Sequence, residues 1–299
     1  EAINKASAGA TIYSTSGTYL FSTNGSPNVV IINNDIKLSG GWNSDFTSQN
    51  GASTIDGANV NNGILVIAGN VFVENFIVQN SRSSNSGAIY IVNGNFTLKK
   101  STLRNNVATS NGAGIFLDNG TLTIINSTIS GNTAGSSGGG IYASNNSSTL
   151  VNIQNSTIAY NHASTGGGIS RTNGAYHITN TIIANNSATS SPDCAGVIAL
   201  ANFNIIENTV GCSITSGSNN LNVDPQIDSN LTGVMLVHTL LTGSPAINAG
   251  SASGCPPTDQ RGVARPQGAA CDIGAYELIP LYTVTFNANG GTGSMSNQT

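Results

Sequence analysis

The sequence is poor in charged residues. Only 7% of its 299 residues are Asp, Glu, Lys or Arg, whereas roughly a quarter is usual for soluble domains. Disordered chains combine low hydrophobicity with a high net charge, but this chain has a net charge of −4 and 38% hydrophobic residues. The composition therefore indicates a folded chain. Its 36 glycines and abundant Asn, Ser and Thr favour strands joined by many turns.

Basic stripes and long apolar runs are also missing. Lys99, Lys100 and Arg104 form the only basic cluster, and we interpret them as solvated charges on the outside of one repeat. Without a basic stripe, binding to nucleic acid is not expected. No apolar run reaches the roughly 18 residues that suggest a membrane span. The sequence opens on Glu1 without a signal peptide, so we expect a mature or excised fragment.

Cysteine is absent from the first 193 residues of the sequence. The four that occur are Cys194, Cys212, Cys255 and Cys271. None has CxxC spacing, so a zinc site is not expected. Four cysteines allow three pairings. We expect Cys194–Cys212 and Cys255–Cys271, because each would close an irregular loop; four free buried thiols are the alternative. Disulfides imply an oxidising setting, so we expect an extracellular or cell-surface location.

What the sequence does contain is a repeat. A tetrapeptide with Ile or Leu first and Asn last occurs five times, ending at Asn80, Asn106, Asn132, Asn161 and Asn186. A glycine-rich line that ends in Ile runs in phase with it, at Ile89, Ile115, Ile141 and Ile169. Two motifs that share one period are typical of a solenoid. We expect the five asparagines to lie at a turn in the left-handed conformation and to form a hydrogen-bonded ladder.

The residues between these motifs predict three short strands in each repeat. A glycine-rich turn precedes a strand such as 89–92, an Asn-Gly turn follows, and a strand with period-two alternation such as 96–98 comes next. A third short strand ends at the repeated Asn. Such a repeat cannot bury a core alone, but a stack of repeats can. The prediction is an all-β, right-handed, single-stranded parallel β-helix with about 25–29 residues per rung.

The regular pattern does not cover the whole sequence. Residues 1–62 are expected to form an N-terminal cap, including a short helix, and the first rungs. Residues 63–190 form the regular repeats, and 191–279 the last rungs and a disulfide-stapled C-terminal cap. Residues 280–299 are expected to start an incomplete β-rich module.

Three stretches resemble known families. The glycine-rich and Asn tetrapeptides over residues 63–186 resemble the repeats of polymorphic outer-membrane proteins and related bacterial surface β-helices, with Ile or Leu in place of the usual Phe. The strings 243–250, 259–262 and 272–277 are similar to the C-terminal part of choice-of-anchor β-helix domains. The segment from Leu281 resembles the start of a Listeria–Bacteroides repeat. These resemblances imply a secreted or surface-displayed protein, often an adhesin.

The residues required for catalysis are not found in an obvious cluster. Glycoside hydrolysis needs two carboxylates that face one cleft, and a lyase would need a calcium-binding acid cluster near a Lys or Arg base. The acids of the repeats do not share a rung position, and the basic cluster lacks neighbouring acids. The three histidines are spread out. We therefore expect no catalytic residue, no metal, no cofactor and no enzymatic activity.

Three function classes follow. The expected one is a non-catalytic structural or adhesive surface protein, a rigid stalk, sheath or filament subunit, with other copies of itself or surface glycans as partners. The alternative is a carbohydrate-binding or polysaccharide-degrading β-helix. Tyr90, Phe116 and Tyr142 recur in register; facing outward they would stack on sugars, and tucked under a loop they would only pack. Ice binding by a Thr column ranks last, because Ile182 interrupts the column.

Overall fold

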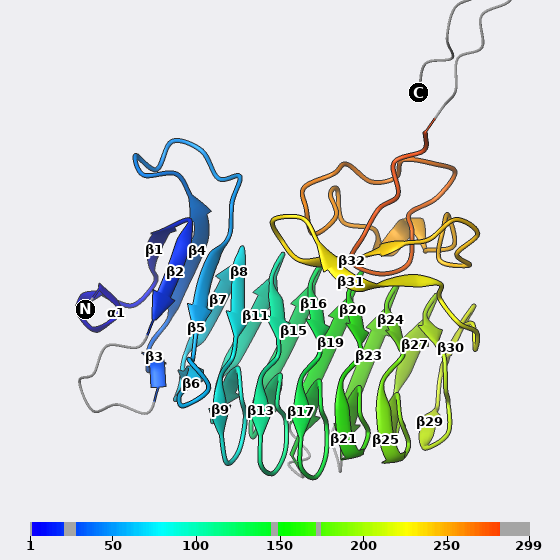
Figure 1. Ribbon diagram of the computed structural model, residues 1–299, viewed down its shortest axis with the longest axis horizontal. Coiled ribbons are helices and arrows are strands. Elements are labelled where there is room, and N and C mark those ends of the chain that lie inside the picture. Colours follow the sequence, from blue (N-terminus) through cyan, green and yellow to red (C-terminus); the bar gives the residue numbers. More distant parts are fainter. Residues whose placement is uncertain (1, 21–27, 145–148, 172–174, 282–299) are drawn as a thin grey trace, which may run out of the picture.

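The protein is a parallel β-helix, as the repeats predict (Figure 1). The computed structural model describes residues 2–20, 28–144, 149–171 and 175–281. Each full rung passes through sheets that we name A to D, and equivalent strands of successive rungs pair in parallel. A single α-helical turn, α1 (Ala2–Lys5), lies at the N-terminal end. In the described ranges no helix is long and apolar enough to cross a membrane.

Sheets A and B meet at the corner that later forms the floor of a cleft. Sheet A contains β1 (Ala10–Thr15), β4 (Ile36–Trp42), β7 (Asn70–Glu74), β11 (Asn95–Lys99), β15 (Thr121–Ile125), β19 (Leu150–Gln154), β23 (Ala175–Thr179), β27 (Leu200–Asn202) and β30 (Gly217–Ser218). Sheet B contains β2 (Gly17–Leu20), β5 (Ser53–Asp56), β8 (Phe76–Gln79), β12 (Thr102–Arg104), β16 (Thr128–Ser130), β20 (Thr157–Ala159), β24 (Ile182–Ala184) and β28 (Ile205–Ile206).

Sheets C and D close the rung. Sheet C contains β3 (Asn28–Ile32), β6 (Asn62–Val66), β10 (Ile89–Ile91), β14 (Ile115–Leu117), β18 (Ile141–Ala143), β22 (Ile169–Arg171), β26 (Cys194–Ile198) and β29 (Cys212–Ile214). Sheet D contains β9 (Arg82–Ser83), β13 (Val107–Ala108), β17 (Thr133–Ala134), β21 (His162–Thr165) and β25 (Ser187–Ser190). Sheet D was not predicted, since its strands are too short to show an alternation.

The interior is filled by columns of aliphatic side chains. Ile89, Ile115 and Ile141 pair in register and are fully buried, and so are Leu98 and Ile124 of sheet A. Neighbouring parallel strands lie about 4.8 Å apart, so each side chain packs on its equivalents above and below. Burying one such side chain contributes roughly 1.5–3 kcal/mol. The repeated Ile thus has the core position that the sequence indicated.

The asparagine ladder forms at the corner between sheets B and D, with one correction. The Nδ2 atom of each ladder residue donates to the Oδ1 atom of the next, at 2.8 Å from Asn106 to Asn132, 2.9 Å from Asn132 to Asn161 and 3.0 Å from Asn161 to Asn186. Asn80 is not a member. Val78 pairs with Leu103, so the motif that ends at Asn80 was aligned one residue too early.

The left-handed conformation also differs from the prediction. Of the five predicted asparagines, Asn80 alone adopts it, with φ of 51°. In later rungs it occurs one residue before the ladder, at Asn105, Tyr160 and Asn185, with φ of 54°, 58° and 56°. The ladder side chains themselves point inward and are at most 8% exposed. The tight turn and the hydrogen-bonded ladder are therefore made by adjacent residues, whereas the sequence pattern had assigned both tasks to one.

After the last rungs the chain folds back along sheet B as a C-terminal cap, residues 227–278 (Figure 1). It begins with an antiparallel hairpin, β31 (Ile227–Thr232) and β32 (Val237–Leu240), and includes the short 3-10 helix η1 (Ala252–Gly254). Thr128 donates through Oγ1 to Gln260 Oε1 at 2.6 Å, and Ala275 N donates to Thr157 Oγ1 at 3.1 Å. The Thr column considered for ice binding is thus buried beneath the cap.

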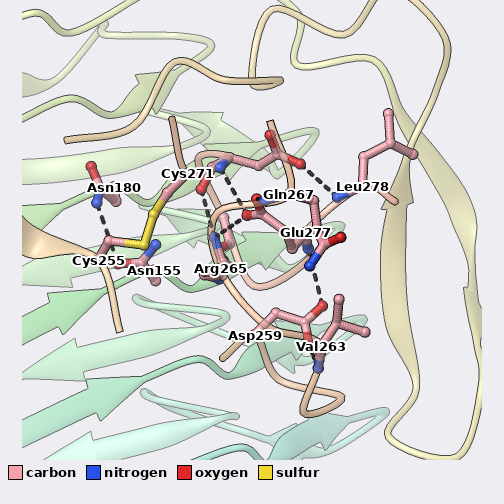
Figure 2. A network of polar contacts seen from close by, with 12 residues as sticks. Asn155, Asn180, Cys255, Asp259, Val263, Arg265, Gln267, Cys271, Glu277 and Leu278 are labelled. Atoms are coloured by element: carbon pink, nitrogen blue, oxygen red, sulfur yellow. Dashed lines mark hydrogen bonds and ion pairs between the residues drawn. A yellow bond between two sulfur atoms is a disulfide. The ribbon is translucent and has the colours of Figure 1, made fainter. Parts of the chain in front are cut away.

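Two disulfides and a buried ion pair hold the C-terminal part together. Cys194–Cys212 and Cys255–Cys271 are bonded, as predicted. In the cap, Arg265 Nη1 lies 3.1 Å from Glu277 Oε2, and both side chains are almost fully buried (Figure 2). The expected β-rich module at 280–299 lies, apart from its first two residues, outside the described residues.

Candidate functional site

A cleft of about 300 Å³ lies between the two parts of the molecule that project from the A–B corner. One wall is the excursion that follows β4, with Gln49, Asn50 and Gly51. The other wall is the C-terminal cap, with residues 233–235 and 260–262. Figure 1 shows these two projections, in blue and in yellow to orange, above the rungs. Asn75 and Lys100 line the floor.

Lys100 has an unusual backbone conformation for its residue type. From β7 onward each rung turns from sheet A to sheet B through one left-handed residue, and the column reads Asn75, Lys100, Asn126, Asn155, Asn180 and Phe203, with φ between 44° and 58°. Asn tolerates this conformation, but a residue with a long side chain seldom adopts it. Strained residues of this kind cluster at functional sites. A lysine in an asparagine column is therefore a candidate functional residue.

The cap leaves this lysine accessible. From the next rung onward the cap covers the same corner, because Asn126 Nδ2 donates to Thr258 O at 2.6 Å and Asn180 Nδ2 donates to Ser251 O at 3.1 Å. At Lys100 the covering stops, and the space between the cap and the excursion becomes the cleft. Asn75 and Lys100 are thus the two corner residues that line the cleft.

The surroundings of Lys100 lower the pKa of its ammonium group below the ordinary value for lysine. Burial, followed by repulsion from Lys99, lowers the pKa of Lys100, although Asp259 and Glu74 oppose the shift. Both of these acids have other partners. Glu74 pairs with Lys37 at 3.1 Å, and Asp259 pairs with Arg261 at 2.7 Å. Among the described residues no hydrogen bond or ion pair engages the Lys100 ammonium. A lysine that can lose its proton in a cleft is able to act as a general base.

The cap side of the cleft carries a fixed cation. The Arg261 guanidinium lies over the Tyr276 ring at 3.7 Å from its centroid, and its Nε donates to Asp259 Oδ2 at 2.8 Å. Its neighbour Gln260 donates to Thr102 Oγ1 at 2.8 Å. These contacts fix the wall before any ligand binds, and a preorganised cation stabilises negative charge better than a mobile one.

The described residues contain no group of three or more His, Cys, Asp and Glu side chains that could hold a metal ion. Besides Lys100, Gln260 and Arg261, the polar side chains that line the cleft are the amides of Gln49, Asn50 and Asn75. Each amide offers both donors and acceptors. Such a set suits hydroxyl-rich ligands.

The predicted aromatic column is present but lies elsewhere, on the outer face of sheet C. Tyr90, Phe116 and Tyr142 pair in register, with ring centroids 5.1 and 5.2 Å apart. Phe116 is only 9% exposed, whereas the two tyrosines are half-buried. The rings meet edge-on or tilted, which is typical of packing. A role in ligand binding stays a prediction.

The sequence was interpreted with Lys100 as a solvated outward charge and Arg261 as part of an ion-pair network in the cap, whereas Gln49 and Asn75 were not singled out. A signal for Lys100 did exist. Once the rungs are aligned, it interrupts a column of asparagines at Asn75, Asn126, Asn155 and Asn180. The remaining cleft residues come from segments with no repeat.

Comparison with known proteins yields one likeness in structure. No family model matches the chain and no curated protein matches it, so the resemblances to surface-protein families are not confirmed. Among solved structures it is similar to one described as the crystal structure of pectate lyase Pel9A, with 16% identity and a TM-score of 0.49. The match covers 92% of this chain and 90% of that one.

This finding contradicts two expectations, that the chain is a non-catalytic structural or adhesive protein and that it is not an enzyme. It agrees better with the polysaccharide-degrading alternative. The search of the sequence for catalytic residues required paired acids or a calcium-binding acid cluster, so it gave no weight to a lysine by itself. Parallel β-helices include enzymes and non-enzymes, so the activity of this chain must be argued from its own cleft.

Proposed function

We propose that this protein degrades an acidic polysaccharide by β-elimination in the cleft, with Lys100 as the general base. The observation that carries the proposal is the position of Lys100 in the cleft: it is unpaired among the described residues, half-buried, and in a left-handed corner that four other rungs fill with asparagine.

The chemistry requires a uronic acid unit in the polysaccharide. The carboxyl group at C6 acidifies the hydrogen on C5, and neutral Lys100 would remove that proton. The electron pair left on C5 forms the C4=C5 double bond, and the bond from C4 to the glycosidic oxygen breaks. The departing oxygen takes a proton from solvent, so no water is added across the bond. Arg261 would stabilise the negative charge that develops on the carboxylate.

Other features are consistent with this proposal. Disulfides suit an oxidising compartment, and we propose that the protein acts outside the cytoplasm, where polysaccharides are found. The half-buried tyrosines of the aromatic column, Tyr90 and Tyr142, offer a further surface that could contact glycans on sheet C.

The experiment is a comparison of the wild type with Lys100→Met on polygalacturonate and on a neutral polysaccharide. We expect the wild type to generate the ultraviolet absorbance of an unsaturated uronate from the acidic polymer only. Lys100→Met should reduce the rate by about 10²–10⁴, the usual contribution of a general base. The pH profile of the wild type should show an apparent pKa below 10.5, the ordinary value for lysine.

The matched control is Lys5→Met, which removes a lysine from α1 and should leave the rate unchanged. Retention of full activity by Lys100→Met would refute the role of this residue. If acidic polysaccharides are cleaved without formation of a double bond, the reaction is a hydrolysis and the proposed mechanism is wrong.

A further inference from the structure

A polar relay crosses three rungs on the outer face of sheet B. Asp56, Gln79 and Arg104 occupy equivalent positions on β5, β8 and β12 and pair in register. Arg104 Nε donates to Gln79 Oε1 at 2.8 Å, and Gln79 Nε2 donates to Asp56 Oδ2 at 2.8 Å. The orientation of the arginine is therefore set by the two preceding rungs.

The far end of the relay is itself held in place. Asp56 Oδ2 also accepts from Asn80 Nδ2 at 2.9 Å, and Asp56 Oδ1 accepts from Ala58 N at 2.8 Å. Both oxygens of the carboxylate are thus engaged by neutral donors. Neither makes an ion pair with Arg104 within 4 Å among the described residues.

This arrangement leaves the terminal amino groups of Arg104 unused. Only Nε has a partner among the described residues, and the side chain is half-exposed. By contrast, Arg265 engages Glu277 through a terminal nitrogen, and Arg261 engages Asp259 in the same way. An anchored guanidinium with two free terminal amino groups presents parallel donors that match a carboxylate.

Along the chain, Lys100 and Arg104 lie on either side of Thr102, which contacts the turn that joins β31 and β32. Lys100 precedes β12 and faces the cleft, whereas Arg104 is the last residue of β12. Between them, Thr102 donates through Oγ1 to the main-chain oxygen of Met235, a residue of that turn. A long ligand that enters the cleft at Lys100 and passes the turn would reach Arg104.

We propose that Arg104 is a second subsite of the same enzyme, which binds the carboxylate of a sugar unit remote from the one at Lys100. The inference rests on the proposed function, because it takes the occupant of the cleft to be an acidic polysaccharide. It adds that the enzyme selects polymers with acidic groups on more than one unit. Arg104 acts in binding, and Gln79 is its positioning residue.

The test measures binding without turnover. In the Lys100→Met background, affinity for polygalacturonate is measured by calorimetry for the single variant and for double variants with Arg104→Met or with Arg82→Met. Arg82 is an exposed arginine on β9 of sheet D, and its loss is the matched control. We expect Arg104→Met to weaken binding about tenfold, a usual effect of losing a charge-assisted contact, and Arg82→Met to change it little.

Two further measurements make the result specific. Full methyl esterification of the polygalacturonate should abolish the difference between the Arg104→Met and Arg82→Met variants, and a sulfated polysaccharide tests whether another anion serves as well as carboxylate. In the wild-type background, Gln79→Met should raise KM with kcat unchanged. Circular dichroism verifies that each variant is folded.

The two proposals fail separately. If Arg104→Met binds polygalacturonate as tightly as Arg82→Met does, the second subsite is refuted, while loss of cleavage in Lys100→Met would still support the proposed function. If Lys100→Met retains cleavage, the general base is refuted, and the binding comparison still decides whether Arg104 recognises an acidic polymer.

Discussion

Buried asparagines at the B–D corner bond to both neighbouring rungs. Asn132 donates through Nδ2 to Leu103 O at 3.1 Å and to Asn161 Oδ1 at 2.9 Å. Its Oδ1 accepts from Asn106 Nδ2 at 2.8 Å. Because these groups are fully buried, a lost partner cannot be replaced by bulk water.

Substitution of Asn132 by Ala should therefore be costly. It removes the acceptor that Asn106 N and Nδ2 share and the side-chain donor to Leu103 O, and each buried unsatisfied group costs about 1–3 kcal/mol. We expect a loss of about 3 kcal/mol in the free energy of unfolding, measured by urea denaturation. The control is Asn95→Ala on β11, where an exposed amide donates to Asn70. Equal losses in the two variants would mean that the ladder contributes nothing special.

The ladder ends at a carboxylate that titrates abnormally. Asp193 Oδ1 accepts from Asn186 Nδ2 at 2.9 Å, and Asp193 Oδ2 accepts from Asn208 N at 2.8 Å. Burial raises the pKa of Asp193 from 3.8 to about 6, even though these hydrogen bonds act in the opposite direction. The folded state thus holds this proton more tightly than the unfolded state does.

The consequence is a pH-dependent stability with a defined sign. The stabilisation of the folded state by protonated Asp193 is fully present below pH about 4, and it is lost as the pH rises to about 6 and above. A shift of about 2 pKa units, at about 1.4 kcal/mol per unit, corresponds to about 3 kcal/mol. Urea midpoints are measured at pH 4 and pH 7 for the wild type and for Asp193→Asn. The midpoint of the wild type should fall more between the two pH values than the midpoint of the variant. Parallel curves would contradict this assignment.

At the scale of elements, the cap depends on its disulfide as well as on its contacts with sheet B. The Cys255–Cys271 bond spans 16 residues, a segment that includes the cleft residues 260–262. The Cys194–Cys212 bond spans 18 residues and joins β26 to β29 in the last rungs. Loops of such similar length should give similar entropic stabilisation, about 3 kcal/mol each. Because one disulfide lies in the cap and the other in the last rungs, their removal should destabilise different parts of the molecule.

We therefore expect the double variant Cys255→Ala/Cys271→Ala to loosen the cap and to lower cleavage of polygalacturonate. Hydrogen exchange resolved by peptide should accelerate over residues 255–271 and remain slow over β11 and β15. The control is Cys194→Ala/Cys212→Ala, which should accelerate exchange near β26 and β29 instead. The idea that the cap disulfide shapes the cleft would be refuted if both double variants lost activity equally.

At the scale of the whole molecule, the sequence predicted the features that repeat. Ile89 and Ile115 could be assigned to the core, and Asn106 and Asn132 to the ladder, because each residue type recurs with the rung. Asn80 was misassigned because the rung that contains β8 has Ser81 at the ladder position. The cleft could not be predicted, since it combines Gln49 and Arg261, which lie far apart in the sequence and meet only because the cap folds back along sheet B.

Because the cap folds back along sheet B, the cleft is complete only after residues 233–235 and 260–262 have been synthesised and have folded. A solenoid whose rungs contact only their neighbours can build up progressively as the polypeptide emerges. The excursion after β4 and Lys100 would then be in place early, but the opposite wall, at residues 233–235 and 260–262, forms last. A nascent or truncated product that ends before this wall would be a folded rod with an exposed lysine and no enclosed site, and premature action on polysaccharide during export would be avoided.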